Sequence, residues 1–183
     1  MTVALTSMSI VFLAGSVLLF VAGAGHSRQH HVFLATLTSH GLLPRRLVRS
    51  SSWCVVGAEL TVGAWGAFAV VDWQLDGGLS VAAALAQAGL YLLLLGYLVA
   101  LVRLRPGAAC GCFHPTTPVN ALTVVRAASL AGVALAFPML VAAETASVPL
   151  TGPQMVVSWL CSATLVAALS VVPHALAGVP AHQ

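Results

Sequence analysis

Two cysteines separated by one glycine are the residues of this sequence that most directly suggest chemistry. Cys110, Gly111 and Cys112 lie in a segment, residues 103–118, that is rich in proline and glycine. These residues exclude a continuous helix, so we expect the two thiols on a tight turn. A disulfide across one residue closes a very small ring, for which Gly111 supplies the unusual backbone angles. Strained disulfides of this kind exchange readily with other thiols.

The residues around this turn favour the thiolate form of cysteine. Arg103 and Arg105 precede Cys110, and His114 follows Cys112 by two positions. The positive end of the next expected helix also begins just beyond the turn, and each of these features lowers the pKa of a thiol. The pattern predicts a redox-active dithiol. Metal binding and a purely structural turn remain as alternatives.

The composition indicates that most of the chain is surrounded by lipid rather than by water. Of its 183 residues, 60% are hydrophobic and 6% are charged, whereas soluble domains carry about 25% charged residues. A surface so poor in charge must face lipid. All seven basic residues are arginines, and the net charge is +3, which in a lipid-soluble chain does not suggest a nucleic-acid partner.

Five apolar runs are long enough to cross a bilayer, which takes about 20 residues. Backbone groups in hydrocarbon must satisfy one another, so these runs must be helices. We therefore predict an all-α integral membrane protein, a bundle of about five transmembrane helices in a single membrane domain of residues 1–183. The expected helices are residues 4–25, 52–71, 78–104, 119–143 and 154–172. No Lys or Arg precedes the first run, which favours a retained helix over a signal peptide.

The charges of the loops predict an orientation in the cell membrane. The arginines fall in the first and third loops or shortly after them, whereas Asp72, Asp76 and Glu144 fall in the second and fourth loops. Basic loops face the cytoplasm. We therefore expect the N-terminus outside, and the C-terminus and the Cys110–Cys112 turn at the cytoplasmic face of a multi-pass plasma-membrane protein.

Two charged residues lie within the expected helices. Glu59 and Arg126 are at similar depths, and charges inside a membrane pair with each other or face an aqueous cavity. We predict that they meet inside the bundle. Gly63 and Gly66 share a helix face with Glu59, which is typical of close helix contact. The pair either sets the helix register or belongs to a polar pocket under the cysteine turn, with a quinone or proton transfer as its use.

The remaining cysteines and histidines suggest less. Cys54 lies close in depth to the cysteine turn and is either a resolving thiol or a small packing residue, whereas Cys161 is expected to pack inertly in the last helix. The first loop contains four histidines without a neighbouring carboxylate or cysteine to complete a metal shell, so we predict no metal site there. We expect a solvated segment near lipid headgroups. These histidines are His26, His30, His31 and His40.

Several of these features together resemble a known family. Cys-Gly-Cys-Phe at residues 110–113 follows a basic helix end and precedes the helix with Arg126, and Glu59 is followed by Gly63 and Gly66. In this the chain resembles the methylamine utilisation protein MauE and the wider MauE/DoxX group of redox-associated membrane proteins, from the first helix to the fourth. The resemblance implies a four-helix core with an added C-terminal helix. The family pattern usually has glycine where this chain has His114.

The resemblance implies a role in maturing a periplasmic methylamine dehydrogenase, whose small subunit is rich in disulfides, beside a thioredoxin-like partner. The leading hypothesis is a membrane thiol–disulfide oxidoreductase in which Cys110 and Cys112 cycle, supported by Glu59 and Arg126. The alternative is a non-catalytic assembly factor or subunit that stabilises a partner protein. A transporter has less support, because the sequence shows no internal repeat. The implied client is periplasmic, whereas the arginines predict cytoplasmic thiols.

Overall fold

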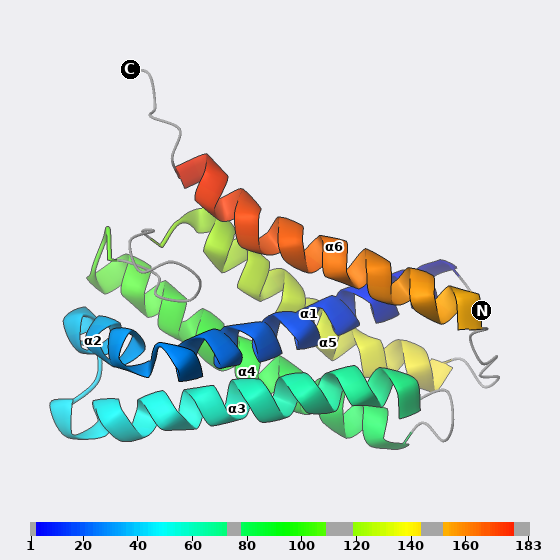
Figure 1. The fold of residues 1–183 in the computed structure, drawn as a ribbon, viewed down its shortest axis with the longest axis horizontal. Coiled ribbons are helices and arrows are strands. Elements are labelled where there is room, and N and C mark those ends of the chain that lie inside the picture. The colour runs from blue at the N-terminus through cyan, green and yellow to red at the C-terminus, as the bar shows by residue number, and fades with distance from the viewer. Residues whose placement is uncertain (1–2, 73–77, 109–118, 144–151, 178–183) are drawn as a thin grey trace.

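The computed structural model describes residues 3–72, 78–108, 119–143 and 152–177, and every secondary-structure element in these ranges is a helix (Figure 1). The helices are α1 (Val3–Arg28), α2 (His30–His40), α3 (Arg45–Asp72), α4 (Gly78–Leu104), α5 (Ala121–Ala143) and α6 (Gly152–Ala177). The long helices lie side by side, and α2 is a short helix at one end of the bundle.

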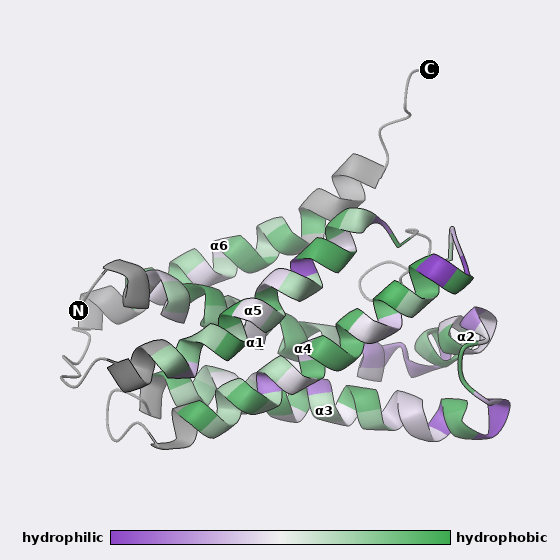
Figure 2. Ribbon diagram, turned by 180° about the vertical axis from the view of Figure 1, so that it is seen from behind, coloured by the Kyte–Doolittle hydropathy of each residue, from purple (hydrophilic) through white to green (hydrophobic). Residues whose placement is uncertain are grey.

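Four of the described helices are long and apolar enough to span a membrane. The candidate spans are Ser7–Arg28, Arg45–Val70, Val81–Leu104 and Ala121–Met139, and α6 adds a shorter apolar stretch, Val156–Leu169. Figure 2 shows hydrophobic residues along the long helices, with many of the strongly hydrophilic residues around α2 and the nearby helix ends. The prediction of an all-α membrane bundle is confirmed.

Helix α1 is the centre of this bundle, because it packs against α3, α5 and α6. Its contact with α3 depends on glycine. A Cβ atom on Gly63 would lie 2.6 Å from the backbone nitrogen of Phe20, and one on Gly66 would lie 2.5 Å from Oγ of Ser16. The predicted glycine face of α3 is therefore confirmed as a site of close helix contact.

Polar side chains of α4 connect this helix to the backbone of α1. The Tyr91 hydroxyl donates to the carbonyl oxygen of Gly15 at 2.8 Å, and Nε2 of Gln87 donates to that of Phe12 at 3.2 Å. Both side chains are buried. Polar groups in hydrocarbon require such partners, so these bonds fix α4 against α1.

The segment expected to be a solvated first loop is in fact mostly helix α2, and the prediction was wrong. Phe33 and Leu37, one helical turn apart, pack against Val48 and Val56 of α3. Gly41 ends the helix with φ 63°, the left-handed conformation that glycine adopts without strain. The apolar face of α2 covers the start of α3, which begins at Arg45 rather than at residue 52.

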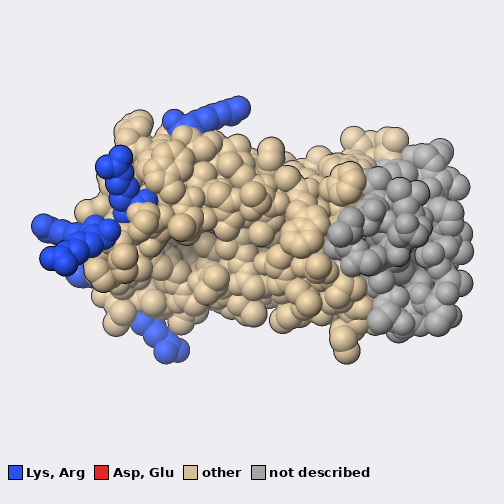
Figure 3. Space-filling model, turned by 90° about the horizontal axis from the view of Figure 1, so that it is seen from below, with Lys and Arg blue, Asp and Glu red and all other residues tan. Residues whose placement is uncertain are grey.

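The described arginines at helix ends lie toward one end of the bundle. Arg28 is in the last turn of α1 and Arg103 in the last turn of α4, and Arg45 begins α3. Figure 3 shows the arginines visible on one face gathered toward that end. Two of these helices end there and one begins there, so charges far apart in the sequence form one basic end.

Candidate functional site

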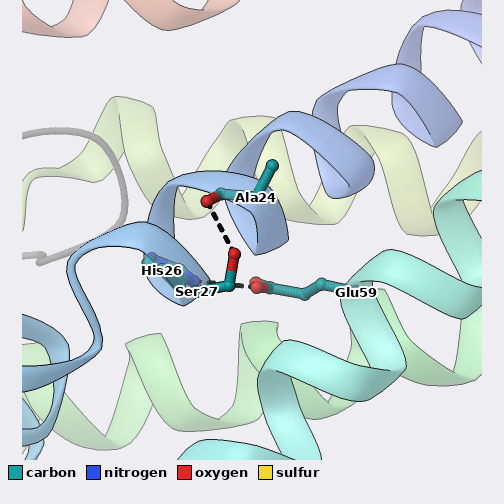
Figure 4. Close-up of polar contacts among 4 residues, drawn as sticks. All are labelled: Ala24, His26, Ser27 and Glu59. Carbon is teal, nitrogen blue, oxygen red and sulfur yellow. Dashed lines mark hydrogen bonds and ion pairs between the residues drawn. The ribbon is translucent and has the colours of Figure 1, made fainter.

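The most strongly buried charge in the described part of the chain is Glu59 of α3. Its side chain is 3% exposed, and Oε2 lies 2.8 Å from Nδ1 of His26, whose side chain is 6% exposed. Figure 4 shows the two side chains directed toward each other from α3 and α1. Gly23 makes room for this approach, because a Cβ atom there would lie 2.9 Å from Cβ of Glu59. The carboxylate accepts the N–H of the imidazole.

Helix α2 holds the imidazole of His26 in place. The ring stacks on Phe33, with centroids 4.1 Å apart and an interplanar angle of 11°. At the C-terminal end of the same helix, Nδ1 of His40 lies 2.6 Å from the hydroxyl of Tyr97 on α4. His26 and His40 are both buried, at 5% and 2% exposure. The expectation of solvated histidines is therefore wrong at these two positions.

His30 has a different environment nearer the surface. Its ring stacks on Trp53 of α3 with centroids 3.9 Å apart, and its Nε2 lies 3.0 Å from Oγ of Ser52. His31, the next residue, is exposed. In the described part of the chain, no group of three or more His, Cys, Asp or Glu residues could hold a metal ion.

The sequence predicted Arg126 as the partner of Glu59, whereas the ion pair found at Glu59 is with His26. Nη1 of Arg126 donates to the carbonyl oxygen of Leu169 on α6 at 2.8 Å. The close α1–α3 contact at Gly23 brings the end of α1 to Glu59, where His26 pairs with the carboxylate. Glu59 and Arg126 nevertheless line the same cavity.

This cavity has a volume of about 430 Å³ and lies among α1, α2, α3, α4 and α5. Most of its wall is apolar, with leucines from α1, α2 and α4. The polar or ionisable side chains in the wall are those of His26, Thr36, His40, Ser51, Cys54, Glu59, Tyr91, Tyr97 and Arg126. The arrangement combines an apolar chamber with a buried acid–base pair, which can hold a small amphipathic molecule.

The cavity reaches the outer surface of the bundle. Leu93 of α4 contributes to the wall and is 74% exposed, and Cys54 of α3 contributes to it and is also exposed. The predicted resolving thiol therefore borders the cavity. Cys161 is also exposed, on α6, so the expectation that it packs between helices is wrong.

The cysteine turn itself lies outside the described residues, as do Gly111 and His114. The chain on its two sides is described. The backbone N–H of Val119 donates to the carbonyl oxygen of Ala108 at 2.9 Å, so the two flanks of the segment lie together. Arg103 and Arg105 are exposed near the first flank. Oδ1 of Asn120 accepts the backbone N–H of Thr123 at 2.9 Å and caps α5 beyond the second flank.

Sequence reasoning missed His26, Phe33 and Tyr97 as parts of this site. His26 directly follows the apolar run expected at residues 4–25, so the sequence alone predicts it at the membrane surface rather than at the depth of Glu59. Phe33 and Leu37 form only one i, i+4 pair in a short segment that begins and ends with histidine, which is a weak helix signal. Tyr97 gives no signal of its own in the apolar sequence of α4.

The fold and the cavity define a multi-pass helical membrane protein with a buried acid–base pair beside a lipid-facing chamber. The family model described as methylamine utilisation protein MauE matches residues 2–140. The chain therefore belongs to the MauE family, as its motifs predicted, and the match covers α1 to α4 and most of α5. No curated protein and no solved structure matches the chain.

Proposed function

We propose that this member of a methylamine-utilisation family is a membrane thiol–disulfide redox component. Cys110 and Cys112 alternate between dithiol and disulfide, and the disulfide form oxidises a client. A client thiolate attacks the Cys110–Cys112 disulfide, and a second client thiolate resolves the mixed disulfide. The client gains a disulfide and the chain regains two thiols. The protein matured in this way is methylamine dehydrogenase, through an intermediate disulfide carrier, or another disulfide-containing redox protein.

One observation carries the proposal, namely the bond between Val119 and Ala108 at the base of the cysteine segment. It holds together the last residues after α4 and the first residues before α5. Cys110 follows Ala108 by two residues, so the cysteine segment begins directly after this anchor. A short loop anchored in this way supports a dithiol presented at the end of the bundle.

The charges near this anchor support an exchanging thiol. Arg103 and Arg105 lie on the α4 side, and the positive end of α5 begins after Asn120. Positive charge and helix N-termini favour thiolate, the form that attacks disulfides. Cys54, exposed beside the cavity, is the candidate resolving thiol.

The basic end supports an orientation for the dithiol. By the positive-inside rule, the end with Arg28, Arg45 and Arg103 faces the cytoplasm. The N-terminus then lies outside the plasma membrane, and the C-terminus lies inside with the Cys110–Cys112 segment. A thioredoxin-like partner, or the client itself, reaches the dithiol from that side.

The test counts thiols in cells with a maleimide mass tag, with and without prior reduction. We expect Cys110 and Cys112 to be tagged fully only after reduction, and Cys161→Ser to remove one tag without changing that pair. In Cys112→Ser, Cys110 should accumulate as a mixed disulfide with its partner. Equal tagging of both cysteines with and without reductant contradicts the redox role. Client maturation that survives the double serine variant favours the assembly-factor alternative.

The same tag in a membrane-impermeant form reports the orientation. If the basic end is cytoplasmic, Cys110 and Cys112 react in inverted vesicles and not in intact cells. The exposed Cys161 controls for reagent that enters the bilayer, because it lies within the apolar stretch of α6. Reaction of the pair in intact cells reverses the orientation and leaves the redox test unchanged.

A further inference from the structure

We propose that the cavity beside Glu59 binds the ring of a quinone that enters sideways from the bilayer. Its volume of about 430 Å³ lies within the range of small-molecule sites, roughly 300–1,000 Å³. The proposal deepens the proposed function and rests on it for the source of electrons. The binding site itself consists of described residues only.

The position of the opening indicates the solubility of the ligand. Cys54 and Leu93 are exposed residues of the cavity wall, and they lie in the spans Arg45–Val70 and Val81–Leu104. An opening between two membrane-spanning helices faces hydrocarbon rather than water. A ligand that uses this entrance is dissolved in the bilayer and has an apolar tail that can remain there.

The polar groups of the wall indicate the chemistry of the ligand's head. The Glu59–His26 pair and the Tyr97–His40 pair come from α1, α2, α3 and α4, and both border the chamber. Such groups donate and accept hydrogen bonds and protons at a ring with oxygen atoms at its edges. A lipid tail could not hydrogen-bond to these groups. A quinone supplies two carbonyl oxygens on an apolar ring.

The electron balance also agrees with a quinone. Oxidation of one dithiol to a disulfide breaks two S–H bonds, forms one S–S bond and releases two electrons and two protons. Reduction of one quinone to its quinol consumes two electrons and adds one proton to each carbonyl oxygen. The Glu59–His26 pair is suited to pass protons to the ring, because a carboxyl group and an imidazole can each carry a proton and these two share a hydrogen bond of 2.8 Å.

Binding of decylubiquinone to the full-length protein in nanodiscs tests the proposal. Leu94 and Leu92 are near neighbours on α4, of which Leu94 lines the cavity and Leu92 is exposed outside it. We expect saturable binding to the wild type, a loss of at least about tenfold in affinity in Leu94→Trp, and no change in Leu92→Trp. The tryptophan side chain would fill part of the cavity and remove apolar contacts with the ring. A tenfold loss of affinity corresponds to about 1.4 kcal/mol, the size of a small loss of apolar contact.

A second variant and a second probe keep the result interpretable. Ala58→Leu narrows the cavity from α3, and leucine is smaller than the tryptophan of Leu94→Trp. It therefore tests the site if Leu94→Trp fails to fold. Decylbenzene has the tail and an aromatic ring but no carbonyl oxygens. Equal competition by decylbenzene, or equal affinity in the wild type, Ala58→Leu and Leu92→Trp, overturns the proposal.

The double variant Cys110→Ser/Cys112→Ser separates this inference from the proposed function. We expect it to bind decylubiquinone as the wild type does, because the polar groups proposed to hold the ring belong to α1, α2, α3 and α4. If this variant binds decylubiquinone but the maleimide test finds Cys110 and Cys112 of the wild type redox-inert, the cavity site is supported and the proposed function is overturned. A redox-active pair without saturable binding overturns the cavity site alone.

Discussion

Gly63 is the residue whose replacement should most clearly damage the bundle. A Cβ atom there would lie 2.6 Å from the backbone nitrogen of Phe20 and 2.8 Å from the backbone oxygen of Ser16. Neither atom can rotate away, because both belong to the backbone of α1. Alanine at this position must therefore separate α1 from α3. Gly57, on the same helix, is the matched control, because a Cβ atom there meets nothing within 4 Å.

The expected difference between the two variants follows from this geometry. Alanine favours a helix over glycine by about 1 kcal/mol, and this gain applies to both positions. Only Gly63→Ala carries the cost of overpacking, which is about 1–3 kcal/mol. In a protein of this size, about 1 kcal/mol corresponds to a shift in melting temperature of roughly 2–4 °C. Gly63→Ala should therefore melt roughly 2–12 °C below Gly57→Ala.

Thermal unfolding of both variants in the same detergent, followed by far-ultraviolet circular dichroism, measures this difference. Comparing two alanine variants removes the common effect of helix propensity. The close α1–α3 contact at Gly63 is refuted if the melting temperature of Gly63→Ala is equal to or higher than that of Gly57→Ala. In that case the backbones of the two helices are not in contact at Gly63.

Three further predictions use the same unfolding measurement. Glu59→Ala leaves the buried His26 without its carboxylate and should cost about 3–5 kcal/mol; an unchanged melting temperature would show that the pair does not form. Tyr97→Phe removes the hydroxyl 2.6 Å from His40 and should cost about 0.5–1.5 kcal/mol, and a stabilised variant contradicts this. Cys161→Ser changes an exposed residue of α6 and should shift stability by less than about 0.5 kcal/mol; a larger loss would place the thiol inside a packed contact.

The membrane helices could be predicted because one physical requirement dominates their sequences. A run such as that of α4 must be apolar over the width of the bilayer, and no tertiary information is needed to recognise it. Helix α2 could not be recognised in this way. It is too short to cross a membrane, and its buried apolar side chains are Phe33 and Leu37. Its helical state depends on the surface of α3 that it covers.

The sequence predicted that Glu59 needs a polar partner inside the bundle, but not which residue that partner is. The position of Glu59 in an apolar helix requires a compensating group, and the sequence offers Arg126 at a similar depth and His26 directly after the first apolar run. The choice between them depends on which helix approaches the carboxylate most closely. Gly23 and Gly63 let α1 approach α3 closely. The distance between two helices depends on how they pack, so it cannot be read from the sequence of either helix alone.

The proposed orientation and the cavity together limit how a periplasmic client can be served. If the basic end is cytoplasmic, Cys110 and Cys112 cannot exchange directly with thiols on the other side of the membrane. The cavity opens toward hydrocarbon near Cys54 and Leu93, and a quinone that leaves it diffuses within the bilayer. Electrons can then leave the dithiol without crossing water. A periplasmic client would still need a second carrier of disulfides, which makes the sidedness of Cys110 decisive for the class of client.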